Sequence, residues 1–216
     1  MPEVFHRSIF LQGPAGRLEA TLWTATEPDF AAVVCHPHPL YGGTMHNKIV
    51  FRAAKALHQR GAAVLRFNFR GVQQSEGAHD RGIGEQADVG AALEYLATEF
   101  PGKHIVLAGF SFGSWVGLRV GCEDTRVTGL IGLGLPVDNP DVDLSYLRSC
   151  AKPKLLIQGG QDQFGSRANV EALFATILEP KHLVIVEGAD HFFTGHLDAV
   201  GAAINDWLDP SLPPRN

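Results

Sequence analysis

Continuous apolar runs alternate along this chain with segments in which apolar residues recur every three to four positions. Six runs lack the polar alternation of a half-exposed strand: 31–35, 62–69, 105–110, 127–135, 155–157 and 183–186. Strands of this kind are buried on both faces, as in a parallel sheet covered by helices. Helical periodicity falls between them, at 44–60, 84–99, 112–122, 166–178 and 195–208. The alternation predicts an α/β fold with right-handed crossovers between parallel strands.

The N-terminal part of the chain has a different pattern. Segments 4–11 and 17–23 are typical of two strands joined by the turn residues 13–16. Added to the six parallel strands, this hairpin predicts a mostly parallel, eight-stranded open sheet flanked by helices. With 216 residues and roughly 150 residues per domain, we expect a single domain over 1–208. The segment 209–216 is expected to be a flexible tail.

Composition and charge narrow the range of partners. Charged residues make up 19% of the chain and apolar residues 45%, against roughly 25% charged in an average domain, which excludes disorder for most of the sequence. A net charge of −5 without a basic run argues against a nucleic-acid partner. There is no signal-peptide pattern, no apolar run near the roughly 18 residues of a membrane span, and no disulfide or zinc spacing among the three cysteines. We expect a cytoplasmic protein that does not bind membranes.

The strongest chemical motif follows the run 105–110. In open α/β sheets, ligands bind beyond the carboxyl ends of the strands. Gly109-Phe110-Ser111-Phe112-Gly113 stands at such an end and fits the pattern Gly-x-Ser-x-Gly. In this nucleophile elbow, a tight strand-to-helix turn exposes the serine oxygen near a helix N-terminus, and the glycines avoid clashes with neighbouring elements. Ser111 is therefore the candidate nucleophile.

A serine hydroxyl needs a base, and the base needs an acid that fixes its tautomer. In this type of fold the chain order is Ser, then Asp or Glu, then His. Asp162 and His191 occur in that order, each just past an apolar run. Asp138 and Asp143 remain alternatives for the acid, whereas Asp190 should face away from the adjacent His191. His196 is a weaker alternative base because it falls in the last predicted helix.

An oxyanion hole requires two N–H donors aimed at the developing alkoxide. The residue after the nucleophile, Phe112, is expected to supply one donor. The loop after the run 31–35 is expected to supply the other, and Pro37 and Pro39 in this loop have no N–H. His38 is therefore the first choice and Leu40 the second.

Aromatic side chains crowd the same edge and predict an apolar acyl pocket. We expect substrate contacts from Phe110, Trp115, Phe164, Phe192 and Tyr41. His36, His38 and His46 lack a carboxylate or thiolate that would complete a metal site, except Cys35, which we expect to point into the sheet. Residues 132–137 lack the last glycine of a dinucleotide loop, and no phosphate-binding Gly-Lys-Ser/Thr motif occurs. Neither a metal nor a cofactor is expected.

Four motifs together resemble one family over nearly the whole chain: residues 36–45 (HPHPLYGGTM), 66–72 (RFNFRGV), 109–113 (GFSFG) and 188–193 (GADHFF). The chain is similar to the α/β-hydrolase superfamily, and more narrowly to small bacterial predicted hydrolases related to dienelactone hydrolase. The resemblance implies a Ser-Asp-His hydrolase in which Ser111, Asp162 and His191 match the motif positions. Gln73 departs from the usual glycine, and Gln163-Phe164-Gly165 departs from the usual pattern after the acid. Dienelactone hydrolase uses a cysteine nucleophile, so its activity is not carried over to Ser111.

These observations predict a serine hydrolase, carboxylesterase-like, that cleaves small ester or related acyl substrates through an acyl-enzyme. The short segment between Leu135 and Lys154 leaves room for only a minimal lid, which favours short or exposed substrates. The same triad would also serve an acyltransferase, a thioesterase or a peptidase. A hydrolase fold that only binds ligands is a further alternative, because fold does not dictate function.

Overall fold

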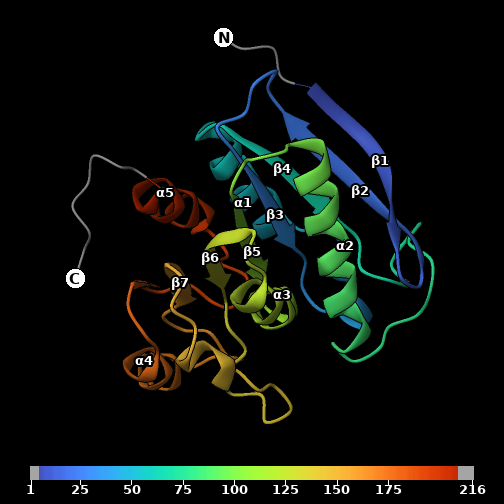
Figure 1. Ribbon diagram of the computed structural model, residues 1–216. Helices are drawn as coiled ribbons and strands as arrows, with labels where there is room; N and C mark the ends of the chain where they lie inside the picture. The colour runs from blue at the N-terminus through green and yellow to red at the C-terminus, as the bar shows by residue number, and fades with distance from the viewer. Residues whose placement is uncertain (1–4, 209–216) are drawn as a thin grey trace.

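A single sheet of eight strands, covered by helices on both faces, forms the centre of the computed structural model, which describes residues 5–208 (Figure 1). Its strand order is β1-β2-β4-β3-β5-β6-β7-β8. The strand β2 is antiparallel to both of its neighbours, and all other neighbouring strands are parallel. The predicted α/β fold with a mostly parallel eight-stranded sheet is therefore confirmed. Residue 4 and the predicted tail at 209–216 lie outside the described residues.

The strands lie close to the predicted runs. Their bounds are β1 (Phe5–Gly13), β2 (Gly16–Thr24), β3 (Phe30–Cys35), β4 (Ala62–Phe67), β5 (Ile105–Phe110), β6 (Val127–Leu133), β7 (Lys154–Gly159) and β8 (Lys181–Val186). Strands β4 and β6 end earlier than the apolar runs that predicted them, because the last apolar residues of both runs turn into loops. Those loops lie at the carboxyl edge of the sheet, where the candidate catalytic residues are also located.

The helices also follow the predicted periodicity. They are α1 (Lys48–Gln59), α2 (Gly84–Glu99), α3 (Phe112–Glu123), α4 (Arg167–Thr176) and α5 (Leu197–Trp207), with short 3-10 helices η1 (Pro39–Tyr41) and η2 (Ser145–Arg148). Helix α1 begins at Lys48 rather than at residue 44, because the Asn47 side chain accepts the N–H of Ile49 and caps the helix there. The start predicted at residue 44 was wrong.

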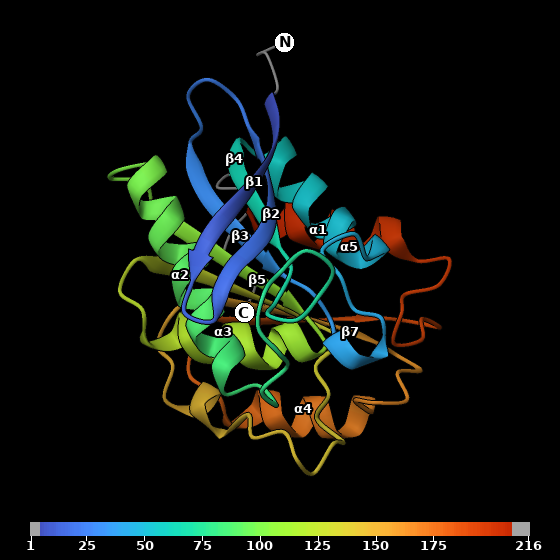
Figure 2. The ribbon, with the colours of Figure 1, turned by 90° about the vertical axis from the view of Figure 1, so that its right-hand side faces the viewer.

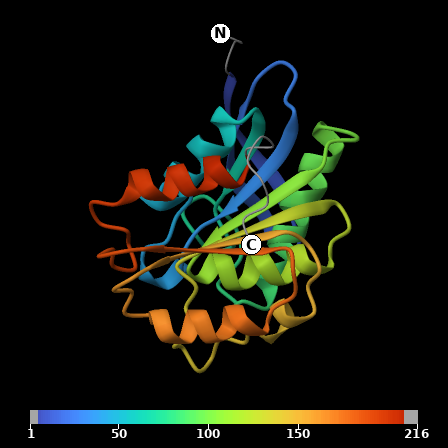
Figure 3. The same ribbon diagram turned by 90° about the vertical axis from the view of Figure 1, so that its left-hand side faces the viewer.

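Alternate residues of each central strand pack against different helices. Ala32 and Val34 belong to the core cluster that includes residues of α1 and α5, whereas Val33 and Cys35 belong to the cluster that includes residues of α2, α3 and α4. Figure 2 shows α1 and α5 on one side of the sheet and α2 and α3 on the opposite side. Figure 3 shows α4 across the sheet from α5. Burial on both faces explains why these strands have no polar alternation.

The connection between β6 and β7 is short and tied down. We call residues 134–153 the cap segment, and its only regular element is η2. The Trp115 indole Nε1–H donates to the carbonyl of Asp143 (3.1 Å), and the Tyr146 hydroxyl donates to the carbonyl of Trp115 (2.8 Å). Lys152 Nζ donates to the carbonyl of Gly121 (2.7 Å). These bonds fasten the cap segment to α3, and the expected minimal lid is confirmed.

No helix among residues 5–208 is both long enough and apolar enough to span a bilayer.

Candidate active site

Ser111 occupies a strained turn between β5 and α3. Its φ is +54°, in the left-handed region that non-glycine residues rarely adopt. The turn is tight because Gly109 and Gly113 have no side chains. A Cβ on Gly113 would lie 2.5 Å from the carbonyl oxygens of Cys35 and His36, and one on Gly109 would lie 2.2 Å from the carbonyl oxygen of Gly113. The glycines thus permit the close approach of α3 to β3 and β5 that the elbow motif predicts.

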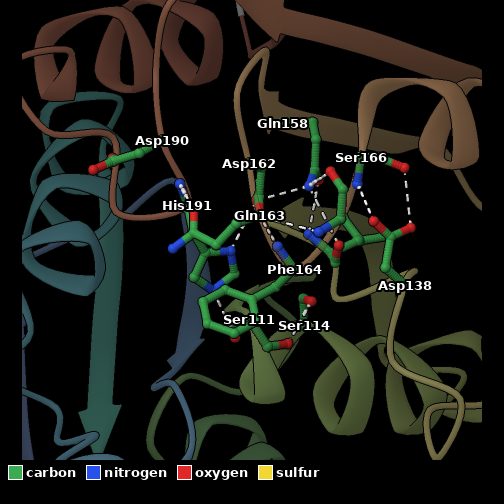
Figure 4. A network of polar contacts seen from close by, with 12 residues as sticks. Ser111, Ser114, Asp138, Gln158, Asp162, Gln163, Phe164, Ser166, Asp190 and His191 are labelled. Atoms are coloured by element: carbon green, nitrogen blue, oxygen red, sulfur yellow. Dashed lines mark hydrogen bonds and ion pairs between the residues drawn. The ribbon is translucent and has the colours of Figure 1, made fainter.

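Three side chains from the loops after β5, β7 and β8 form one hydrogen-bonded chain (Figure 4). His191 Nε2 lies 3.0 Å from Ser111 Oγ, and His191 Nδ1 lies 2.8 Å from Asp162 Oδ2. His191 is 3% exposed and Asp162 is 5% exposed. Burial excludes competing water from the histidine–carboxylate contact and strengthens it. The structure therefore brings together the three residues that the chain order selected.

Asp162 is held by donors on its other sides. Its Oδ1 accepts the backbone N–H groups of Phe164 (2.8 Å) and Gly165 (3.0 Å), and its Oδ2 accepts from Gln158 Nε2 (2.8 Å). Because a carboxylate can only accept, the proton of a neutral His191 stays on Nδ1 and Nε2 is free to accept from Ser111. The geometry can therefore deprotonate the serine hydroxyl as it attacks.

Gln158 is a supporting residue that sequence reasoning missed. It is fully buried at the end of β7, and besides Asp162 its amide bonds the backbone of Leu135 and Gly165. A polar residue inside the apolar stretch 155–159 was the available signal. Buried amides of this kind are satisfied by specific partners, and here the partners join the acid loop to the cap segment.

The alternative acids do not contact His191 within the described part of the chain. Figure 4 shows Asp190 directed away from His191, and Asp138 lies on the far side of Asp162. The three carboxylates accept hydrogen bonds elsewhere: Asp138 from Ser166 and Asn169, Asp143 from Ser145, and Asp190 from Thr194. His196 precedes α5, and its Nδ1 contacts the carbonyl of Thr194 (2.8 Å).

The loop after β3 lies beside the first turn of α3. Phe112 is the first residue of α3, so its N–H has no acceptor within the helix. The imidazole of His38 packs on the Phe112 ring with a centroid distance of 4.9 Å. The Leu40 N–H donates to His38 Nδ1 (3.2 Å), so the geometry disfavours Leu40 as an oxyanion donor. His38 remains the candidate for the second donor.

His36 stabilises this loop from below. It is fully buried, its Nδ1 lies 2.6 Å from the carbonyl oxygen of Pro37, and its Nε2 accepts the N–H of Phe69 (3.0 Å). Burial lowers the pKa of His36 to about 4, so the ring is neutral near pH 7. Since backbone groups occupy both ring nitrogens, His36 joins the loops after β3 and β4 instead of binding a ligand.

Of the predicted aromatic contacts, three are exposed at the site. Phe164 and Phe192 are 49% and 42% exposed, and their rings lie 4.8 and 5.3 Å from the His191 ring. Tyr41 is 87% exposed and lies 4.7 Å from the His38 ring. These side chains give the site an exposed aromatic surface beside His191 and His38.

One aromatic expectation requires correction. Phe110 is fully buried beneath His191 (5.1 Å between ring centroids), so it supports the imidazole and cannot line a substrate pocket. Trp115 donates its Nε1–H to the carbonyl of Asp143, and its ring lies close to Gly82, so it links α3 to the cap segment and to the loop before α2. A substrate contact from Trp115 stays a prediction.

A cavity of about 370 Å³ lies between the loops after β3 and β4. Its lining includes Pro39, Thr44, Val72, Gln73 and His79. Gln73 has a φ of +49°, the left-handed region that favours glycine, which explains why glycine is usual there in the family it resembles. Sequence reasoning missed this cavity because the loop at 71–83 has no apolar periodicity.

Together, this mostly parallel sheet and the serine elbow at the end of β5 define an α/β-hydrolase. Residues 21–205 match the family model of the alpha/beta hydrolase domain, and the chain belongs to that family.

Relatives cover nearly the whole chain. An uncharacterized protein of Rickettsia prowazekii is 38% identical in an alignment of 208 residues that covers 93% of this chain and 87% of the relative. An alpha-beta serine hydrolase homologue from Coxiella burnetii is 37% identical with a TM-score of 0.86, covering 92% of this chain and 95% of that one. A serine hydrolase without lid from Xanthomonas campestris is 34% identical with a TM-score of 0.83, covering 96% and 97%. The last resemblance agrees with the short cap segment.

Proposed function

We propose that this α/β-hydrolase is a serine esterase for small acyl substrates, with Ser111 as the nucleophile. The observation that carries the proposal is the hydrogen-bonded chain Ser111–His191–Asp162, with contacts of 3.0 and 2.8 Å. Ser111 Oγ attacks the ester carbonyl while His191 Nε2 takes its proton. His191 then gives the proton to the alkoxide leaving group, and the acyl-enzyme remains. A water that His191 deprotonates attacks the acyl carbon and releases the acid, which restores the serine.

Charge develops on the carbonyl oxygen during both steps. The backbone N–H groups of Phe112 and His38 are the proposed donors to this oxyanion. Asp162 orients His191 and stabilises the imidazolium that forms during proton transfer. The same triad could cleave a thioester or a peptide bond instead of an ester. It could also pass the acyl group to an acceptor other than water. Assays with different substrates and acceptors separate these reactions from ester hydrolysis.

Access to Ser111 favours small substrates. The cap segment holds only η2 and is tied to α3, so it does not form a deep tunnel over the serine. The exposed rings of Phe164 and Phe192 beside His191 offer a shallow apolar surface. Such a surface suits the acyl or alcohol part of a short ester better than a long lipid chain.

A fluorophosphonate tests the nucleophile directly. We expect wild type to gain the mass of one covalent adduct and Ser111→Ala to gain none. Ser145→Ala, a change in η2 outside the hydrogen-bonded chain, is the matched control and should be labelled like wild type. Labelling that persists in Ser111→Ala would refute the assignment.

A substrate panel tests the reaction class. Ester, thioester, amide and lactone substrates are compared with wild type and Ser111→Ala. We expect Ser111-dependent hydrolysis to be fastest on short esters. Folded, labelled enzyme that turns over thioesters or amides but not esters would contradict the esterase proposal, and a protein that is not labelled and turns over nothing would favour a binding role.

A further inference from the structure

A second carboxylate–imidazole pair lies close to the loop after β3, where the connection between β4 and α2 meets the first turn of α2. His79 Nδ1 is 2.8 Å from Glu85 Oε1, with side-chain exposures of 11% and 0%. Glu85 also accepts the backbone N–H groups of Asp80 and Gly82, each at 2.8 Å. These bonds fix the carboxylate and, with it, the position of the imidazole. The triad proposed above does not use this pair.

The imidazole of His79 keeps unused hydrogen-bonding capacity. Its Nδ1 is buried and faces Glu85 Oε1 at 2.8 Å, so a ligand cannot reach this nitrogen. The other ring nitrogen, Nε2, has no hydrogen bond to any described residue. Because His79 lines the cavity, Nε2 is the ring nitrogen that is left for a ligand there.

His79 joins the cavity to the proposed oxyanion hole. It lines the 370 Å³ cavity between the loops after β3 and β4. Its ring lies 5.0 Å from the ring of His38 and 5.7 Å from that of Phe112, the two residues proposed to bind the oxyanion. An ester whose carbonyl oxygen lies between those donors can therefore extend one of its two arms, the acyl part or the alcohol part, toward His79.

The charges around the cavity favour an uncharged arm. The one guanidinium in its lining, that of Arg70, is already paired with Asp88 (2.7 Å). The buried carboxylate of Glu85 would repel an anionic arm, and a cationic arm would find no carboxylate in the lining to pair with. A hydroxyl group carries no charge and both donates and accepts, so it can bond an imidazole in either tautomer.

We propose that His79 is a specificity-determining residue that hydrogen-bonds a hydroxyl group on one arm of the ester, and that Glu85 is its positioning residue. The preferred substrates are thus small esters with an uncharged, hydroxylated arm. This inference rests on the proposed esterase function of Ser111.

Two pairs of nearly isosteric esters locate the hydroxyl and test its recognition. Methyl 3-hydroxybutanoate against methyl 3-methylbutanoate places it on the acyl arm, and 2-hydroxyethyl butanoate against propyl butanoate places it on the alcohol arm. We expect wild type to prefer the hydroxylated member of one pair in kcat/KM by about fivefold to tenfold more than His79→Phe does, the effect of one hydrogen bond. The comparison with His79→Phe cancels the intrinsic reactivity of the esters.

The variants separate recognition from folding. His79→Phe keeps a ring against His38 and Phe112 but has no nitrogen that could bond a hydroxyl group, so it should lose the preference. His79→Gln should retain part of the preference because its amide can still bond a hydroxyl. The ratio of kcat/KM values for two substrates does not depend on the fraction of enzyme that is folded. His104→Leu, an exposed histidine before β5, is the control and should keep the full preference.

Glu85→Gln should lower the preference, which is read as the ratio of kcat/KM values within each pair. Glu94→Gln, an exposed change on the same helix, is its control and should keep the wild-type ratio. The His79 role is overturned if the ratio in both pairs is the same for His79→Phe as for wild type. No turnover of any of these esters by folded wild type refutes the esterase proposal itself, and the inference falls with it.

Discussion

Arg70 and Asp88 form a buried ion pair between the loop after β4 and α2, and breaking this pair tests quantitatively how the loop is held. The Arg70 guanidinium makes three contacts with the carboxylate between 2.7 and 3.2 Å, and the Arg70 backbone N–H adds a fourth at 3.0 Å. The side chains are 11% and 0% exposed. In Arg70→Met the carboxylate would keep one donor in a site without water.

The cost of this change follows from the unpaired charge. Removing one partner of a buried ion pair costs about 3–5 kcal/mol, out of the roughly 5–15 kcal/mol that hold a domain together. For a chain of this size the melting temperature should fall by about 10 °C. Arg70→Met/Asp88→Leu should recover most of the loss, since neither charge remains.

Urea unfolding followed by circular dichroism measures these free energies, with the slope of the transition as a check on two-state behaviour. Arg119→Met is the matched control, because Arg119 pairs with Asp143 at 3.5 Å on the surface and should change stability by less than about 1 kcal/mol. A loss below about 1 kcal/mol in Arg70→Met, or a double variant no more stable than the single one, would refute the reasoning.

Three further predictions follow from the site and its supports. Asp162→Asn should lower kcat about 10⁴-fold on an ester substrate while circular dichroism stays unchanged, because an amide can stabilise the wrong His191 tautomer; a loss below tenfold would contradict this role. Burial lowers the pKa of His36 from 6.5 to about 4, so the unfolded chain protonates first as the pH falls. Wild type should therefore lose about 3 kcal/mol of stability between pH 6.5 and 4 in urea titrations, and His36→Gln should lose less; parallel pH profiles would count against it. Gly113→Ala should cost about 2 kcal/mol or more because its Cβ would meet backbone oxygens at 2.5 Å, whereas Gly90→Ala in α2, with open space around it, should gain up to about 1 kcal/mol in thermal melts.

The sequence was sufficient for the sheet and for the three residues that meet at its edge. Continuous apolar runs identify strands buried on both faces, and the turn from β5 into α3 can form only with glycines at 109 and 113. Contacts across loops were harder to predict. The Leu40 N–H bonds the His38 ring because the loop after β3 folds back on itself. Phe110 is buried because it belongs to β5 and lies on the face that α1 and α5 cover. His79 lies in a loop without periodicity, so no local pattern predicts its contact with Glu85 at the start of α2.

The attachment of the cap segment to α3 has a kinetic consequence. In many hydrolases a lid must move before the substrate reaches the nucleophile, and that motion can limit the rate. Here Trp115, Tyr146 and Lys152 bind this connection to the helix that begins at the serine. Substrate entry therefore needs no opening step of this segment. Progress curves should begin without a lag, and the rate should rise smoothly with ester concentration rather than jump where the ester begins to form micelles.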